Sequence, residues 1–178
     1  MGFVRLADGE DRFRVRAEGG EDLLYVARRV VRMAVEDIGL ADPRGLSIAL
    51  AAKDAYDFLG SPEGDLAIAE ALVYLATAPK SNAAYMAQKA AWRSAKETGS
   101  LMPPANILNA PTKLMKQIGY GANYEYDHDA EGGFSGANYW PDGMAPQEFY
   151  APSGRGFEQR VAERMTWWEE RRRERQGR

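Results

Sequence analysis

Apolar residues recur along residues 21–99 with the spacing of four successive α-helices. In residues 21–39 they lie at positions i, i+3, i+7, i+10, i+11 and i+14, counted from Leu24, which places them on one helical face. Residues 42–60, 61–79 and 81–99 repeat this pattern, with Gly, Pro or Ser at the junctions. Short connections between capped helices are typical of a helical bundle or array. The pattern therefore predicts an all-α fold.

The residues at the junctions predict where individual helices begin and end. Asp42 is expected to cap the second helix, with Pro43 at the first helical position, where its missing N–H is not needed. Pro79 is expected to end the third helix and Ser81 to cap the fourth. Residues 66–78 are apolar nearly all round, so the third helix is expected to be the central one.

The second half of the chain has a different pattern. A short helix is predicted within residues 111–118 and a long one at about 156–175. Residues 119–152 have little periodicity but many aromatic side chains, which disordered segments lack, so we expect an ordered irregular segment held by its rings. Residues 1–18 are predicted to form an appendage with a short hairpin, and residues 19–178 a single domain.

Composition narrows the classes of function. The chain has 178 residues and no cysteine, which excludes disulfides and a thiolate zinc site. Its net charge of -3 gives no overall attraction to phosphate backbones, so nucleic-acid binding would need a local basic patch. The sequence has neither a signal-peptide pattern nor an apolar run long enough to span a bilayer. We therefore expect a cytoplasmic protein without a membrane partner.

Catalytic chemistry has little support in the sequence. His128 is the single histidine, so any Ser-His-Asp arrangement would have to use it, and a surface or capping role is favoured. Residues 127–132 follow the start of a calcium loop, but Asn138 stands where a bidentate Glu is required. Lys80 and Ser81 match only the end of a phosphate-binding loop, because its glycines are missing. We predict a non-enzymatic chain without catalytic residues, metal or cofactor.

Basic side chains offer candidates for a local patch. Lys89 and Arg93 are one helical turn apart, and Lys113 and Lys116 nearly so. Such pairs are usually solvated, although with exposed tyrosines they could line a groove for single-stranded nucleic acid. The candidate contacts for DNA or a partner are Arg28, Arg29, Lys80, Asn82, Lys89, Arg93, Lys113 and Lys116.

Several unusual strings point to a known family. They include EDIGLADP at residues 36–43, YLATAPKSN at 74–82, and NAPTKLMK at 109–116, followed by GYG at 119–121. In this order and spacing, the chain closely resembles the C-terminal region of the RarA/MgsA family of replication-associated AAA+ ATPases, from about residue 18 to residue 168. The eukaryotic relative in this family is the Werner-helicase-interacting protein.

The resemblance implies a role without catalysis. Family members are clamp-loader-like, DNA-stimulated ATPases that act in replication, recombination and repair at stalled forks, and their motifs for ATP and Mg²⁺ lie upstream of this region. The C-terminal region is α-helical, extends the clamp-loader-like collar and helps to assemble a homotetramer. The implied partners are further copies of the chain, and also DNA and fork proteins such as single-strand binding protein, at the nucleoid.

Two departures from the family pattern bear on these expectations. Asp22-Leu23 stands where Asp-Pro is usual, and residues 106–108 replace the usual His-Leu-Arg, which removes a histidine and a cation. If that cation contacts DNA in relatives, the contact is lost here. The expected function is oligomerisation, and the alternative is a module that binds single-stranded DNA or DNA ends. The candidate interface or packing anchors are Tyr85, Tyr120, Tyr124, Tyr126, His128, Tyr139 and Trp140.

Overall fold

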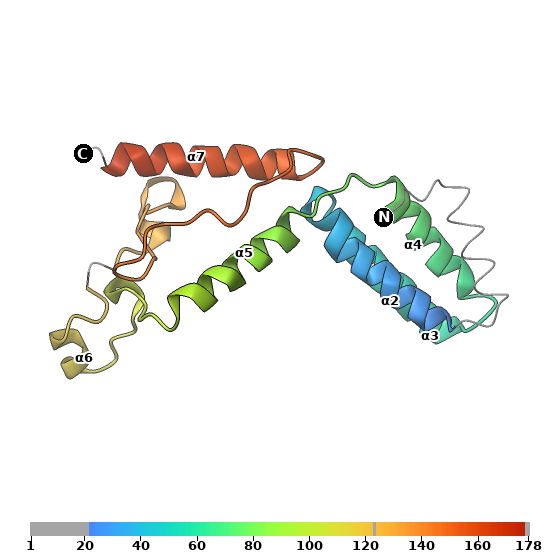
Figure 1. Cartoon of the computed structure of the whole chain (residues 1–178), viewed down its shortest axis with the longest axis horizontal. Coiled ribbons are helices and arrows are strands. Elements are labelled where there is room, and N and C mark those ends of the chain that lie inside the picture. Colours follow the sequence, from blue (N-terminus) through green and yellow to red (C-terminus); the bar gives the residue numbers. More distant parts are fainter. Residues whose placement is uncertain (1–21, 123, 177–178) are drawn as a thin grey trace. The chain divides into compact units, whose positions relative to one another are not determined.

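The computed structural model describes residues 22–122 and 124–176, so the hairpin predicted within residues 1–18 lies outside the described residues. Within these two ranges the regular structure is helical and contains no strand, which confirms the predicted all-α class (Figure 1). Short 3₁₀ segments occupy residues 39–41, 105–107, 127–129 and 131–133. The α-helices are α2 (Leu23–Met33), α3 (Arg44–Leu59), α4 (Asp65–Thr77), α5 (Ala83–Thr98), α6 (Lys113–Gln117) and α7 (Glu158–Gln176).

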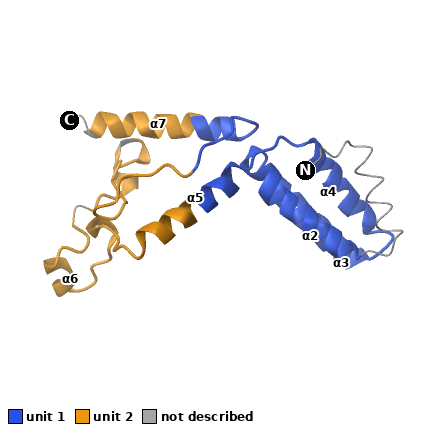
Figure 2. Cartoon of the chain, viewed as in Figure 1, with its two compact units in different colours: residues 1–89, 150–162 blue, residues 90–149, 163–178 orange. Residues whose placement is uncertain are grey.

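The chain divides into two compact units (Figure 2). Unit 1 comprises the described parts of residues 1–89 together with residues 150–162. Unit 2 comprises residues 90–149 and 163–178, again as far as they are described. The boundary between the units therefore falls within α5 and within α7, and each unit is built from two separate stretches of the sequence.

The core of unit 1 lies between α2, α3 and α4. Ile38, Ile68 and Leu75 are its largest fully buried apolar side chains, and the burial of each contributes about 1.5–3 kcal/mol. Gly45 of α3 allows the helices to approach closely, because a Cβ atom there would lie 3.0 Å from the Leu75 side chain. The other buried members of this core are Leu23, Val26, Ala27, Val30, Ala34, Ala49, Ala52 and Ala71.

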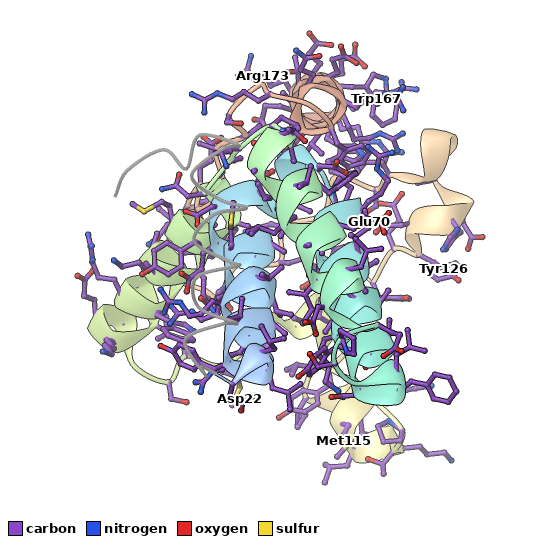
Figure 3. The ribbon with its side chains drawn as sticks, turned by 90° about the vertical axis from the view of Figure 1, so that its right-hand side faces the viewer. Asp22, Glu70, Met115, Tyr126, Trp167 and Arg173 are labelled. Carbon is purple, nitrogen blue, oxygen red and sulfur yellow. The ribbon has the colours of Figure 1, made fainter. Side chains whose placement is uncertain are left out.

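The start of α2 follows ordinary capping chemistry. The Oδ1 atom of Asp22, which is labelled in Figure 3, accepts a hydrogen bond of 2.9 Å from the backbone N–H of Leu24. After Met33 the helix widens into a π-helical turn over Ala34–Ile38, which Gly39 ends with a φ of 52°. This is the helix end that the glycine predicts.

Gly39 also allows two backbone segments to meet. The Ser81 N–H donates a hydrogen bond of 2.9 Å to the Asp37 carbonyl, and a Cβ atom on Gly39 would lie only 2.7 Å from the Ser81 carbonyl oxygen. Real Cβ atoms do not approach an oxygen this closely. Both the positive φ and the close approach therefore require glycine at this position.

Asp42 and Ser81 both accept a backbone hydrogen bond at the start of a helix, as predicted, but α3 begins at Arg44, so Pro43 precedes the helix and does not open it. Asp42 Oδ1 accepts from the Arg44 N–H at 3.2 Å and from Arg44 Nε at 3.0 Å, while Tyr74 donates its hydroxyl hydrogen to Oδ2. The side-chain hydrogen bond from Arg44 is the main reason that the pKa of Asp42 lies below its usual value. Ser81 Oγ accepts from the Ala83 N–H at 3.2 Å, as expected for a cap.

The third helix, α4, does not take the central position predicted for it. It buries one face through Ile68, Ala71 and Leu75, whereas Leu66 on the opposite side is 73% exposed. A helix that is apolar nearly all round has no preferred face of its own, so its burial depends on how many neighbours the fold supplies. In unit 1 those neighbours are α2 and α3.

In unit 2 the irregular segment packs against α7 through an aromatic ring, as predicted. The ring of Phe134 packs against Trp167 and Trp168 of α7, with centroids 6.5 and 6.3 Å away. Arg172 lies over the Phe134 ring, and Arg175 donates a hydrogen bond of 2.8 Å to the Ser135 carbonyl. Figure 3 looks along α7 and shows that Trp167 and Arg173 project from different sides of this helix.

Candidate functional site

Three side chains chosen from the sequence meet at one surface pocket of unit 2. Lys116 of α6 and the rings of Tyr120 and Tyr124 line it, together with residues 106–110 and the backbone of Gly121. The pocket has a volume of about 550 Å³. Lys113, another candidate predicted from the sequence, lies on the same short helix as Lys116. Lys113, Lys116, Tyr120 and Tyr124 therefore belong to one region of unit 2.

Local backbone chemistry builds this pocket. Thr112 caps α6 by accepting the Met115 N–H at 3.2 Å, and the Tyr120 N–H donates to the Met115 carbonyl at 3.0 Å. The Gly121 N–H then donates to the Ala105 carbonyl at 2.7 Å, with a φ of 71° at Gly121. This turn, which the positive φ of Gly121 allows, joins the segment that carries the tyrosines to Ala105.

Only one of the two polar atoms in the side-chain amide of Asn106, a residue that lines the pocket, forms a hydrogen bond within the described part of the chain. Asn106 Nδ2 donates a hydrogen bond of 3.0 Å to the Asn138 carbonyl. Its Oδ1 atom is buried and has no donor among the residues that the structure describes. Asn106 opens the tripeptide that departs from the family pattern, and Leu108 of the same tripeptide also lines the pocket.

A buried carboxylate in unit 1 was not anticipated from the sequence. Glu158, the first residue of α7, is 0% exposed and accepts hydrogen bonds from the Tyr150 hydroxyl at 2.7 Å and the Ser153 N–H at 2.8 Å. The Ser153 hydroxyl donates at 2.5 Å, and the Ser81 hydroxyl contributes as well. We call Tyr150, Ser153, Ser81 and Glu158 the carboxylate cluster.

The carboxylate cluster changes the ionisation of both its titratable members. Burial opposes the ionised form of Glu158 and is the largest single influence, but the hydrogen bonds from Ser153, Tyr150 and Ser81 outweigh it and lower the pKa below 4.5. Burial first, and then the hydrogen bond to Glu158, raises the pKa of Tyr150. Glu158 therefore stays ionised and Tyr150 protonated at neutral pH.

The residues before Glu158 attach the same segment to the rest of unit 1. The Phe157 N–H donates to the Ala41 carbonyl at 2.8 Å, and Arg155 Nη1 donates to the Lys80 carbonyl at 3.1 Å. Gly156 has a φ of 53°, and a Cβ atom there would overlap the Ala41 carbonyl oxygen. The sequence does contain a signal for this turn, namely two glycines before a helix with an acidic first turn. That signal does not identify the residues that the turn contacts.

The other basic candidates lie in unit 1 or on α5. Arg28 and Arg29 are exposed on α2, and Arg93 is exposed on α5. Lys89 Nζ lies 5.2 Å from the centre of the Tyr85 ring, one helical turn away, in a cation–π contact. None of these lines the pocket of unit 2.

Two further candidates lie at the start of α5. Lys80 is half-buried, and its backbone carbonyl is the acceptor that Arg155 uses. Asn82 is exposed, and its carbonyl accepts from the Met86 N–H in the first turn of the helix. Their backbones thus have structural roles, while the Asn82 side chain faces solvent.

The remaining aromatic candidates of unit 2 are partly paired. The rings of Tyr126 and His128 lie 5.0 Å apart, and both side chains are exposed. The Tyr139 hydroxyl lies 3.4 Å from Asp127 Oδ2, and Trp140 packs edge-on against Phe149 at 5.6 Å. Trp140 is therefore a packing anchor, and the exposed rings of Tyr126 and Tyr139 are available to a partner.

The described residues contain neither a cluster suited to a metal ion nor a helix suited to a membrane. Within residues 22–122 and 124–176 no group of three or more His, Asp or Glu side chains is arranged to hold a metal ion. The Asp127 carboxylate instead accepts the Ser135 N–H at 2.9 Å. None of the described helices combines the length and apolar character that crossing a membrane requires.

The sequence of this chain is similar to those of known proteins over most of its length. Residues 14–169 match the family described as MgsA AAA+ ATPase C terminal. The chain is 51% identical over 152 residues to replication-associated recombination protein A of Coxiella burnetii, a match that covers 85% of the chain and 34% of the relative. The protein of the same name in Escherichia coli K12 is 47% identical over 155 residues, covering 86% and 34%.

A more distant relative is also similar to most of the chain. Replication-associated recombination protein A of Bacillus subtilis is 32% identical over 135 residues, which cover 76% of the chain and 32% of that protein. The chain thus spans about a third of the length of these relatives. The RarA/MgsA resemblance drawn from the strings at residues 36–43, 74–82 and 109–116 is confirmed. The chain belongs to the family of C-terminal regions of MgsA (RarA) AAA+ ATPases.

Proposed function

We propose that this chain is the oligomerisation region of a RarA-type ATPase acting in replication-associated recombination, and that it assembles as a tetramer without catalysing a reaction. The observation that carries the proposal is the exposure of α5. Of the sixteen residues of this helix, only Ser94 is buried. An isolated helix of this length is marginal in water, and helices in proteins are stabilised mainly by packing. We therefore infer that α5 needs a packing partner, and we propose that another copy of the chain supplies it.

The exposed side of α5 has the composition of an interface. Tyr85 and Trp92 are seven residues apart, hence on one face, and are 40% and 64% exposed. Met86 beside them is 52% exposed. Aromatic residues and methionine are enriched in interfaces, and large exposed apolar patches mark sites of association. Next to this face runs a row of small residues that permits close helix approach, formed by Ala84, Ala87, Ala91 and Ala95.

The first experiment is light scattering coupled to size exclusion. We expect the chain to have a mass near four times 19.7 kDa that does not fall on dilution. Trp92→Glu should lower this mass, because it places a charge in the apolar contact. The matched control is Phe58→Glu on α3, since Phe58 is 89% exposed but lies on another helix. A monomeric parent chain would contradict the oligomerisation proposal, and loss of assembly in the control alone would remove α5 from it.

A further inference from the structure

The pocket of unit 2 has a lining that packing does not require. Its lining residues include two tyrosines, Tyr120 and Tyr124, one lysine, Lys116, and two asparagines, Asn106 and Asn109. Among its described lining residues there is no Asp or Glu. Its volume of about 550 Å³ lies in the range of about 300–1,000 Å³ that small-molecule sites occupy. The chemistry therefore favours a ligand with a flat ring and a negative charge.

We propose that this pocket binds one unstacked nucleotide, with its base against the tyrosine rings and its phosphate at Lys116. Aromatic rings bind bases by stacking whatever the base, because every base has a π-face. Tyr124 is 62% exposed, so its ring is free to receive one. Lys113, three residues before Lys116 on α6, adds a second exposed cation on the same side of this helix.

The amide of Asn106 helps to fix one wall of the pocket. Its Nδ2 atom donates to the Asn138 carbonyl, which fixes the orientation of the group. Its Oδ1 atom is buried and therefore inaccessible to a ligand, so the ligand contacts of the proposal come from the tyrosine rings and Lys116.

The same ligand chemistry has two sources, a free mononucleotide and an unpaired nucleotide within a DNA strand. A fluorescent thymidine oligonucleotide and unlabelled thymidine monophosphate distinguish them in an anisotropy measurement at low salt. Displacement of the oligonucleotide by the monophosphate would identify a site for a single nucleotide. Displacement only by unlabelled oligonucleotide would identify a site that needs the strand. Absence of binding by both probes would overturn the proposal.

Variants of the pocket give the decisive comparison. Tyr124→Leu should weaken oligonucleotide binding by about 5- to 150-fold, the loss that corresponds to one stacked base. Lys116→Gln should weaken binding and reduce its salt dependence by about one phosphate contact. The matched controls are Tyr126→Leu and Lys96→Gln, because both side chains are exposed and neither lines the pocket. The controls should bind as tightly as the parent chain.

A gain of affinity separates binding from damage to the fold. Leu108 lines the pocket, so Leu108→Arg adds a cation there and should tighten oligonucleotide binding several-fold. Unchanged binding in both pocket variants, or an equal loss in the controls, would overturn the proposal. Trp92→Glu on α5 should retain nucleotide binding, so a failure of the oligomerisation proposal and a failure of this one give different results.

Discussion

Gly156→Ala should lower the free energy of unfolding by about 3–4 kcal/mol and the melting temperature by about 10 °C. Gly156 has a φ of 53°, in the left-handed region, where a Cβ atom costs about 1–2 kcal/mol. The added Cβ would also overlap the Ala41 carbonyl oxygen and lie 2.8 Å from Pro79 Cγ. Relief of that overlap must break the 2.8 Å hydrogen bond between the Phe157 N–H and the same carbonyl.

The neighbouring glycine provides a control for the backbone effect. Gly154 has a φ of 70°, but a Cβ atom there would meet nothing within 4 Å. Gly154→Ala should therefore show only the cost of the left-handed conformation, about 1–2 kcal/mol. Thermal unfolding followed by circular dichroism gives both values. Equal losses in the two variants would mean that the close approach to Ala41 does not contribute to stability.

Glu158→Gln should lower the free energy of unfolding by about 3 kcal/mol at neutral pH. The carboxylate accepts all the hydrogen bonds of the carboxylate cluster, and bonds to a charged acceptor are the stronger kind. A Gln side chain has one acceptor oxygen, and its NH₂ group would face the donors of Ser153 or Tyr150. Glu163→Gln, an exposed change on the same helix, should have little effect.

The pH dependence of stability tests the charge itself. The folded-state pKa of Glu158 lies below its ordinary value of 4.5, so its contribution is present above about pH 4.5 and is lost as pH falls through the folded-state pKa. The difference in unfolding free energy between the parent chain and Glu158→Gln should shrink over that acid range. A difference that stays constant from pH 7 down to pH 3 would show that the charge is not the cause.

The helices were predictable because their signals are local. Asp42 and Ser81 cap their helices through backbone groups two residues away, and Gly39 ends a helix through its own positive φ, so their identity is enough to place a helix end. The all-round apolar pattern of α4 carried no such information, because the number of neighbours it meets depends on the whole fold. Its predicted central position was accordingly wrong, with Leu66 left 73% exposed.

The candidate functional site also has one part that the local sequence predicts and another part that it does not. Lys116, Tyr120 and Tyr124 lie within nine residues, so their convergence on one pocket needed only a short helix and a turn. The carboxylate cluster joins Ser81 to Glu158, which lie far apart in the sequence, and no local pattern predicts such a pairing. Buried polar contacts between distant segments are the part of this structure that sequence periodicity does not contain.

Because unit 1 is built from two separate stretches of the sequence, its two parts are synthesised at different times. Residues 150–162 complete this unit, yet the ribosome makes residues 90–149 of unit 2 before them. Ser81 is therefore synthesised well before Glu158, its partner in the carboxylate cluster. A nascent chain stopped before residue 150 has α2, α3 and α4 but lacks this attachment. The stability of unit 1 therefore depends on whether residues 150–162 have already been synthesised.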